Sequence, residues 1–249
     1  MKFGVCNLSI VPLRAEASHR SEMVSQVLFA ETFEILQQES DFVKIKLLDT
    51  KYEGWIQASQ YTVVDNNNDS STIIVGMGGA LAKSEKKDVR LLHGTKISSL
   101  EVRFGTDDFN ISGDFRETNQ VDFKEEFDKL CKYYLNTPYL WGGRSLYGID
   151  CSGFSQVVFN HFGVQLPRDA WQQAELGTVV DFLTEIKAGD LAFFDNEAGR
   201  ITHVGVMIDT ETIIHASGCV RIDKMDSEGI FNADINKFTH RLRIVKRYF

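Results

Sequence analysis

The chain has 249 residues, of which 43% are hydrophobic and 25% are charged. These proportions are typical of a globular protein and exclude a disordered or collagen-like chain. The formal net charge is −8, from 27 basic and 35 acidic residues. An acidic chain gains little from contact with phosphates, so we expect no nucleic-acid partner, and a small amine-bearing substrate fits the charge better.

The sequence contains no apolar run near the roughly 18 residues of a membrane span, so no membrane partner is expected. Its first twenty residues also lack the apolar core, about 7–15 residues long, of a signal peptide. The cysteines Cys6, Cys131, Cys151 and Cys219 form no CxxC pair. We therefore expect a cytoplasmic protein with free thiols.

The N-terminal half has the pattern of short β-strands. Residues 1–65 contain the strand candidates Leu28–Leu36 and Phe42–Leu48, as expected of a small SH3-like β module. Seven consecutive polar residues, 65–71, then predict a linker.

Residues 72–120 are interpreted as a second SH3-like β module, although one larger β domain over 1–120 would look similar. Glycines separate its strand candidates, which are Thr72–Val75, Val89–Leu92, Ile97–Phe104 and Phe109–Ile111. The cluster Gly76-x-Gly78-Gly79 lacks a following helix, so it is interpreted as a turn and not as a dinucleotide-binding motif.

Residues 121–249 change to an α+β pattern. Asp122 and Glu125 predict the start of a helix that ends before Pro138, and a second helix should begin near Cys151 and end at Gly163. Apolar runs then predict consecutive antiparallel strands at Leu191–Phe194, Val204–Ile208 and Thr212–His215, with an edge strand at Arg243–Phe249.

The chemistry centres on Cys151, His203 and His215. A helix N-terminus favours a thiolate, so the pKa of Cys151 should be lowered and the sulfur should be nucleophilic. If the turn places residue 205 opposite residue 215, the two histidines share one face of the sheet. The alternatives are a buried structural cysteine with hydrogen-bonded histidines, or a Cys/His/His zinc site, which lacks a close ligand pair.

Several motifs resemble those of the NlpC/P60 family of cysteine peptidases. They are Tyr139-Leu140-Trp141-Gly142-Gly143-Arg144, Gly148-Ile149-Asp150-Cys151-Ser152-Gly153-Phe154, Leu166-Pro167-Arg168-Asp169, Gly189-Asp190-Leu191, His203-Val204-Gly205-Val206 and Ile214-His215-Ala216-Ser217. The resemblance covers about 121–249 and implies a papain-like α+β catalytic domain. The N-terminal half is similar to bacterial SH3 modules, and the whole layout resembles γ-D-glutamyl-L-diamino acid endopeptidases.

The resemblance also implies roles for the catalytic residues. Cys151 would be the nucleophile, His203 the general base, and His215 the group that orients His203. Tyr139 would place its phenol beside the thiol and the scissile carbonyl, where it or a backbone N–H would hold the oxyanion. No metal and no organic cofactor are implied.

The substrate implied by the resemblance is a small murein peptide, L-Ala-γ-D-Glu-diamino acid, cleaved after D-Glu. Asp169 would pair with the free amine, while Ser152 and Arg168 are candidates for the D-Glu carboxylate. Asp150 would either bind substrate or cap the Cys151 helix.

In the first β module, Glu22 is preferred over Glu16 and Glu31 as a further carboxylate for the amine. The function expected is therefore peptide hydrolysis in cell-wall recycling. The alternatives are different acyl chemistry on the same Cys–His pair, as in an amidase or transferase, and a non-catalytic cell-wall binding protein.

Overall fold

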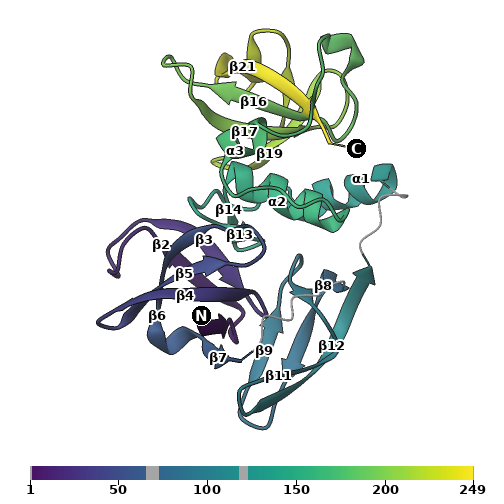
Figure 1. Cartoon of the computed structure of the whole chain (residues 1–249). Coiled ribbons are helices and arrows are strands. Elements are labelled where there is room, and N and C mark those ends of the chain that lie inside the picture. Colours follow the sequence, from purple (N-terminus) through teal and green to yellow (C-terminus); the bar gives the residue numbers. More distant parts are fainter. Residues whose placement is uncertain (1, 66–72, 118–122, 249) are drawn as a thin grey trace. The chain divides into compact units, whose positions relative to one another are not determined.

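The computed structural model describes residues 2–65, 73–117 and 123–248 (Figure 1). The chain forms two compact units. Unit 1 consists of residues 1–119 and 141–146, and unit 2 consists of residues 120–140 and 147–249. The chain therefore leaves unit 2 for six residues just before the helix that carries Cys151.

The first sheet of unit 1 has seven strands in the order β3-β2-β6-β5-β4-β1-β7. Their bounds are β1 Lys2–Val5, β2 Ile10–Arg14, β3 Met23–Leu28, β4 Thr32–Glu39, β5 Phe42–Leu47, β6 Glu53–Gln57 and β7 Thr62–Val64, with a 3₁₀ turn at Ala58–Gln60. Alternation explains how these strands pack. In β5, for example, Val43, Ile45 and Leu47 are buried while Lys44 and Lys46 are half-exposed.

The strand predicted over Leu28–Leu36 is in fact interrupted by a turn. β3 ends at Leu28 and β4 begins at Thr32, with Ala30 at a positive φ of 66° between them. The Glu31 carboxylate accepts a hydrogen bond from the Leu28 backbone N–H at 2.9 Å and stabilises this turn.

The second sheet of unit 1 contains β10, β8, β12 and β11 in that order, and β9 also pairs with β8. Its strands are β8 Ile73–Lys83, β9 Asp88–Leu91, β10 Lys96–Ile97, β11 Glu101–Phe104 and β12 Asp107–Glu117.

The turn predicted at Gly76-x-Gly78-Gly79 is wrong, because these residues lie within β8. The register of β8 with β12 shifts between Gly113 and Phe115, and this bulge directs Asp114 toward the glycines. The Gly78 N–H donates to the Asp114 carboxylate at 2.9 Å. A Cβ at Gly76 would lie only 2.3 Å from that carboxylate, so only a glycine lets the Asp114 side chain lie this close to β8.

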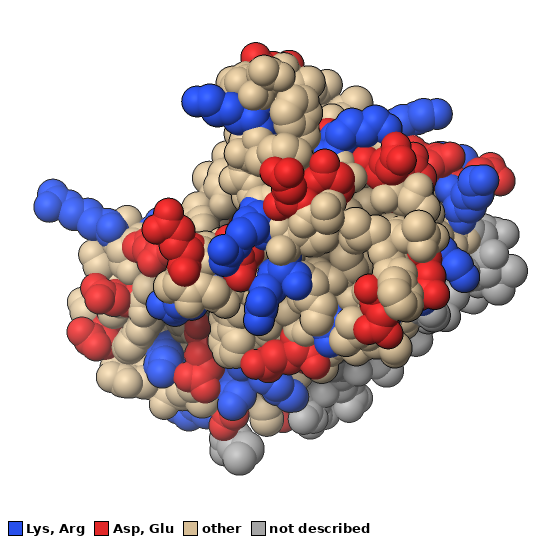
Figure 2. All heavy atoms as spheres, turned by 90° about the horizontal axis from the view of Figure 1, so that it is seen from above, with Lys and Arg blue, Asp and Glu red and all other residues tan. Residues whose placement is uncertain are grey.

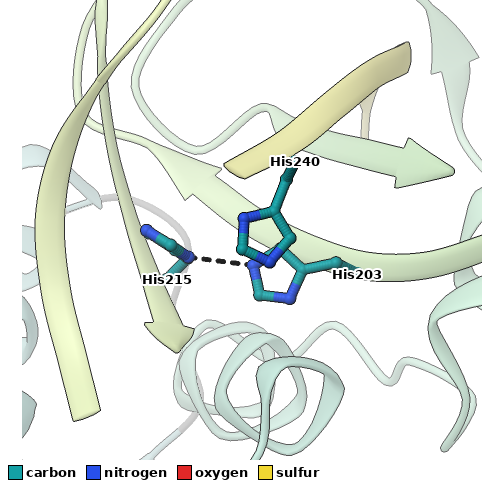
Figure 3. Close-up of side chains that lie close together, drawn as sticks. All are labelled: His203, His215 and His240. Carbon is teal, nitrogen blue, oxygen red and sulfur yellow. Dashed lines mark hydrogen bonds between the residues drawn. The ribbon is translucent and has the colours of Figure 1, made fainter. Parts of the chain in front are cut away.

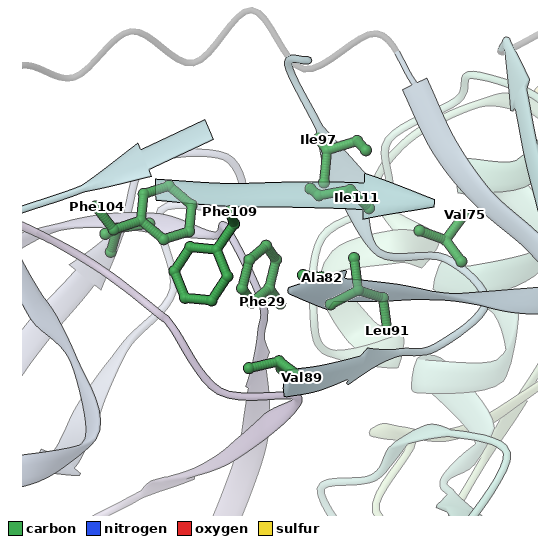
Figure 4. Packing of buried hydrophobic residues seen from close by; sticks show 10 residues of the cluster. Phe29, Val75, Ala82, Val89, Leu91, Ile97, Phe104, Phe109 and Ile111 are labelled. Carbon is green, nitrogen blue, oxygen red and sulfur yellow. The ribbon is translucent and has the colours of Figure 1, made fainter. Parts of the chain in front are cut away.

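One hydrophobic core joins the second sheet to residues of the first (Figure 4). Phe29, in the turn after β3, contacts both Phe104 and Phe109, with ring centroids 5.3 and 5.4 Å from its own. Val5 of β1 belongs to the same buried cluster. The two sheets of unit 1 are therefore not packed independently.

Unit 2 combines helices with a sheet whose strand order is β15-β21-β16-β17-β18-β19-β20, and β20 also pairs with β21. The helices are α1 Phe123–Tyr134, α2 Cys151–His161 and α3 Ala170–Ala174, with a 3₁₀ turn at Leu183–Glu185. The strands are β15 Thr178–Val179, β16 Leu191–Asp195, β17 Ile201–Met207, β18 Thr212–Ser217, β19 Cys219–Met225, β20 Gly229–Asn232 and β21 Lys237–Arg247. The short segments β13 Arg144–Ser145 and β14 Gly148–Ile149 precede α2.

The helix predictions are largely confirmed. α1 ends at Tyr134, before Pro138, while the predicted cap Asp122 lies outside the described residues. α2 is buried along its whole length and contacts β17 and β18. Gly163, at a φ of +79°, follows the end of α2 in the left-handed conformation that favours glycine.

The strands of unit 2 differ from the prediction at the C-terminus. The segment predicted as an edge strand, Arg243–Phe249, belongs largely to β21, which pairs with β16 on one side and with β15 and β20 on the other. These partners could not be predicted from the sequence, because β15 and β20 have only two and four residues. The four cysteines are free, as expected.

The described helices include none with the length and apolar character needed to cross a membrane. On the face drawn in Figure 2, acidic and basic side chains alternate in small groups.

We predict that Phe29→Ala destabilises unit 1 by about 3–5 kcal/mol, because it empties the middle of the shared aromatic core. The matched control is Phe182→Ala, since Phe182 is 65% exposed and the change should cost less than about 0.5 kcal/mol. Urea unfolding followed by Trp55 and Trp141 fluorescence measures the difference. Equal midpoints for the two variants would show that the sheets do not depend on Phe29.

Candidate functional site

Cys151 is the first residue of α2, as predicted. Asp150 caps this helix, and its carboxylate accepts a hydrogen bond from the Gly153 N–H at 2.7 Å. Cys151 is buried, and the backbone of Val204, the residue after His203, hydrogen-bonds to it. The structure thus places the thiol against β17, beside the first of the two predicted histidines.

The expectation of a lowered cysteine pKa is wrong for this environment. Burial, followed by the negative charge of Asp150, raises the pKa of the Cys151 thiol to about 12. The backbone groups of Val204 and Ser152 and the charge of Arg168 act in the opposite direction but do not outweigh burial. In this state of the site Cys151 is therefore a neutral thiol and needs a base to become a nucleophile.

His203 and His215 lie together, in the register that the sequence suggested. Gly205 of β17 pairs with His215 of β18, and His203 Nε2 lies 2.9 Å from His215 Nδ1 (Figure 3). A Cβ at position 205 would lie 2.9 Å from the His215 Cβ, so glycine permits this close approach. Burial, together with His240 and His215, lowers the pKa of His203 well below its ordinary value.

Asp223 continues this chain of side chains and was missed by the sequence analysis. Its carboxylate lies 2.9 Å from His215 Nε2 and accepts two hydrogen bonds from Arg221, at 2.6 and 2.9 Å. Burial would raise the pKa of Asp223, but these hydrogen bonds lower it to about 2. The local sequence pattern predicts the opposite, because the alternation of Val220 and Ile222 places Asp223 outward, whereas in the structure Asp223 is buried and Ile222 is exposed.

Because Asp223 is ionised, the proton positions on His215 and His203 can be assigned. Asp223 can only accept, so His215 donates its Nε2–H to Asp223 and keeps a lone pair on Nδ1. His203 then donates its Nε2–H to His215 Nδ1. The lone pair of His203 is therefore on Nδ1, the ring nitrogen that remains for a proton from the thiol.

His240, from β21, is the second residue that the sequence analysis missed. Its ring stacks on His203 with centroids 4.0 Å apart and planes at 25° (Figure 3). Burial and the nearby His215 lower the pKa of His240 to about 4. One ring nitrogen each of His203, His215 and His240 lies within 4.8 Å of the other two, so the three could together hold a metal ion.

Tyr139 is held beside the start of α2 by backbone pairing. It forms a bridge with Ile149, and its N–H donates to the Gly218 carbonyl at 2.9 Å. Burial, then the neighbouring Cys151 and Asp150, raise the pKa of the Tyr139 phenol. The phenol thus remains a hydrogen-bond donor within electrostatic reach of the thiol.

Asp150, Ser152 and Arg168 form one buried cluster. Arg168 makes an ion pair with Asp150 through both of its terminal nitrogens and donates to the Ser152 hydroxyl at 2.7 Å. Asp150 therefore serves as the helix cap and as the partner of Arg168. Any role of this cluster toward a substrate carboxylate stays a prediction.

Asp169 is half-exposed at the N-terminus of α3, and its backbone N–H donates to Gln172 Oε1 at 3.1 Å. Glu22 belongs to unit 1 and accepts a hydrogen bond from the Trp141 indole. Their predicted contacts with a substrate amine stay predictions. Glu31 is paired with Arg144 at 2.9 Å within unit 1.

The family and relatives of the chain can now be compared with this geometry. The model of the NlpC/P60 family matches residues 136–237, and that of the bacterial dipeptidyl-peptidase SH3 domain matches residues 13–60. The gamma-D-glutamyl-L-lysine dipeptidyl-peptidase of Bacillus subtilis is 28% identical over 214 residues, which cover 77% of this chain and 71% of that protein.

A second relative matches a shorter part of the chain. The murein DD-endopeptidase MepS/murein LD-carboxypeptidase of Escherichia coli is 33% identical over 138 residues, which cover 55% of this chain and 68% of that protein.

Solved structures support the fold over the whole length. An NlpC/P60 family protein from Bacillus cereus superimposes with a TM-score of 0.81 at 19% identity, covering 99% of both chains. The N-terminal region is thus SH3-like and the C-terminal region is papain-like. The matched family model covers Cys151, His203 and His215, and together with the Escherichia coli relative it shows that the chain belongs to the NlpC/P60 family of cysteine peptidases.

Proposed function

We propose that this chain hydrolyses the γ-D-Glu–diamino acid bond of small peptidoglycan-derived peptides that carry a free N-terminal L-Ala. The proposal rests on one observation. The Cys151 thiol lies at the backbone of Val204, next to His203, and hydrogen bonds connect His203 to His215 and His215 to Asp223. The named activity of the Bacillus subtilis relative supports the choice of bond. Consumption of such peptides would place the enzyme in cell-wall recycling.

The reaction would begin with proton transfer from the Cys151 thiol to Nδ1 of His203. The sulfur then attacks the γ-carbonyl carbon of D-Glu, and His203 passes the proton to the departing amine of the diamino acid. Water, deprotonated by His203, would hydrolyse the resulting thioester. Because both Cys151 and His203 are neutral at the start, attack and proton transfer would be coupled.

The charge that develops on His203 would be stabilised through His215 by the ionised Asp223. Tyr139 would donate its phenolic hydrogen to the oxyanion of the tetrahedral intermediate, together with backbone N–H groups at the start of α2. The unionised state of this phenol supports that role.

Recognition of the substrate would use charge. Asp169 would accept charge-assisted hydrogen bonds from the free α-ammonium of L-Ala, each worth about 1.5–3 kcal/mol. The Arg168–Ser152 pair would lie near the D-Glu α-carboxylate, with Asp150 holding Arg168 in place.

The first test compares L-Ala-γ-D-Glu-diaminopimelate with its N-acetylated form. We expect hydrolysis of the free peptide alone, and its loss in Cys151→Ala, because the thiol is the nucleophile and the amine is read by a carboxylate. Mass spectrometry of the products locates the cleaved bond, and Cys219→Ala is the matched cysteine control.

Equal cleavage of both peptides would contradict the amine-reading pocket while keeping the thiol chemistry. No cleavage by the folded wild-type protein would contradict the proposal and favour another acyl chemistry or a binding role.

A second prediction concerns the negative charge at the end of this series of hydrogen bonds. Asp223 Oδ2 accepts from both His215 Nε2 and Arg221 Nε, while Oδ1 accepts from Arg221 Nη2. In Asp223→Asn, either orientation of the amide sets its NH₂ against an Arg221 N–H, and the negative charge that would stabilise protonated His203 is lost. We expect kcat to fall by about 10²–10⁴, with KM nearly unchanged.

Asp234→Asn is the matched control, because Asp234 contacts the same Arg221 at 2.8 Å but is exposed. Its effect on kcat should stay below about fivefold. Thermal unfolding of both variants checks that the fold persists. A wild-type kcat in folded Asp223→Asn would show that the charge of Asp223 does not support His203.

A further inference from the structure

Three imidazoles of the site converge from three different strands. His203 comes from β17, His215 from β18 and His240 from β21, and one nitrogen of each lies within 4.8 Å of the others. The peptidase chemistry uses two of them, whereas His240 has no role in it. Figure 3 shows the His240 ring lying over His203, next to the nitrogen that faces His215.

We propose that His203, His215 and His240 form a binding site for a divalent transition-metal ion such as Zn²⁺, and that the bound ion reversibly inhibits the peptidase. Imidazole nitrogen is a preferred ligand of Zn²⁺, and three histidines with one open position form a known coordination set.

The distances fit with a small rearrangement. Zn–N bonds of about 2.0–2.1 Å place two nitrogens of a tetrahedral ion about 3.3 Å apart. His203 Nε2 and His215 Nδ1 are 2.9 Å apart, and the nitrogen of His240, which lies within 4.8 Å of both, needs to approach by at most about 1.5 Å.

The surrounding hydrogen bonds present the lone pairs that an ion needs. Asp223 holds the Nε2–H of His215, so that Nδ1 faces the cluster, as in a carboxylate–histidine–metal arrangement. The Thr239 hydroxyl lies 3.3 Å from the Ile230 carbonyl and 2.9 Å from His240 Nδ1. If it donates to the carbonyl and accepts from Nδ1–H, both contacts are satisfied and the Nε2 lone pair of His240 is available.

Binding would disable the base without any change of oxidation state. The ion takes the Nε2 lone pair of His203, so the proton formerly shared with His215 moves to His203 Nδ1. That nitrogen can then no longer accept the Cys151 proton. This inhibition rests on the proposed function, whereas metal binding itself does not.

The test is a calorimetric titration of Zn²⁺ into Cys151→Ala, which removes the thiol as a ligand and needs no substrate. We expect one site per chain, and affinity at least tenfold weaker when His240→Phe or His240→Gln is added. His19→Ala, which removes an exposed histidine outside the cluster, should leave the affinity unchanged.

Peptide hydrolysis by the wild type should be inhibited by Zn²⁺ and restored by a chelator, while Mg²⁺, which prefers oxygen ligands, should not inhibit. Folded His240→Gln should need at least tenfold more Zn²⁺ for half-inhibition, relative to its own metal-free rate. Loss of binding in Cys151→Ala, or equal affinity with and without His240, would overturn the proposal. An inactive wild type that still binds Zn²⁺ in Cys151→Ala would refute only the proposed function.

Discussion

A buried carboxylate sets the direction of the hydrogen bonds in the site. Asp223 lies at the end of a chain in which each ring nitrogen has one defined role, because an ionised carboxylate can only accept. Arg221 keeps Asp223 ionised despite its burial. Asp223 thereby places a negative charge next to His215, which a neutral imidazole alone would not supply. Through His215, the same carboxylate also orients His203, the proposed base.

This arrangement depends on how closely two strands approach. Gly205 pairs with His215 across the two strands, and its missing side chain lets β17 and β18 approach closely at this point. α2 packs on both strands and brings Cys151 to the backbone of Val204. Burial of the resulting pair keeps both partners neutral. The same burial that assembles the site therefore favours the proposed base-assisted attack over a preformed thiolate.

The sequence predicted the features that depend on local rules. The start of α2, its cap at Asp150 and the pairing of residues 205 and 215 follow from helix capping and strand periodicity. Asp223 lies on β19, which directly follows β18 in the chain, and it was missed because the alternation of Val220 and Ile222 predicts that it points outward. His240 was missed because its strand reaches the site through a pairing distant in sequence, β21 with β16. The pKa of Cys151 was mispredicted because burial, which no local pattern reveals, exceeds the effect of the helix N-terminus. The turn assigned to Gly76–Gly79 failed for a similar reason, since Asp114 comes from a neighbouring strand.

The six residues that pass from the catalytic unit into unit 1 affect how the chain is made. Within unit 1, Arg144 donates its backbone N–H to the Gln26 side chain and pairs with Glu31. During synthesis these partners emerge well before Arg144, so unit 1 stays incomplete until the chain has grown past residue 146. At ~5–20 residues per second, the 27 residues from 119 to 146 take roughly 1–5 s. If the N-terminal modules of two relatives were exchanged at a junction near residue 119, Arg144 would no longer meet the Gln26 and Glu31 with which it pairs here. Residues 141–146 must therefore be exchanged together with these modules.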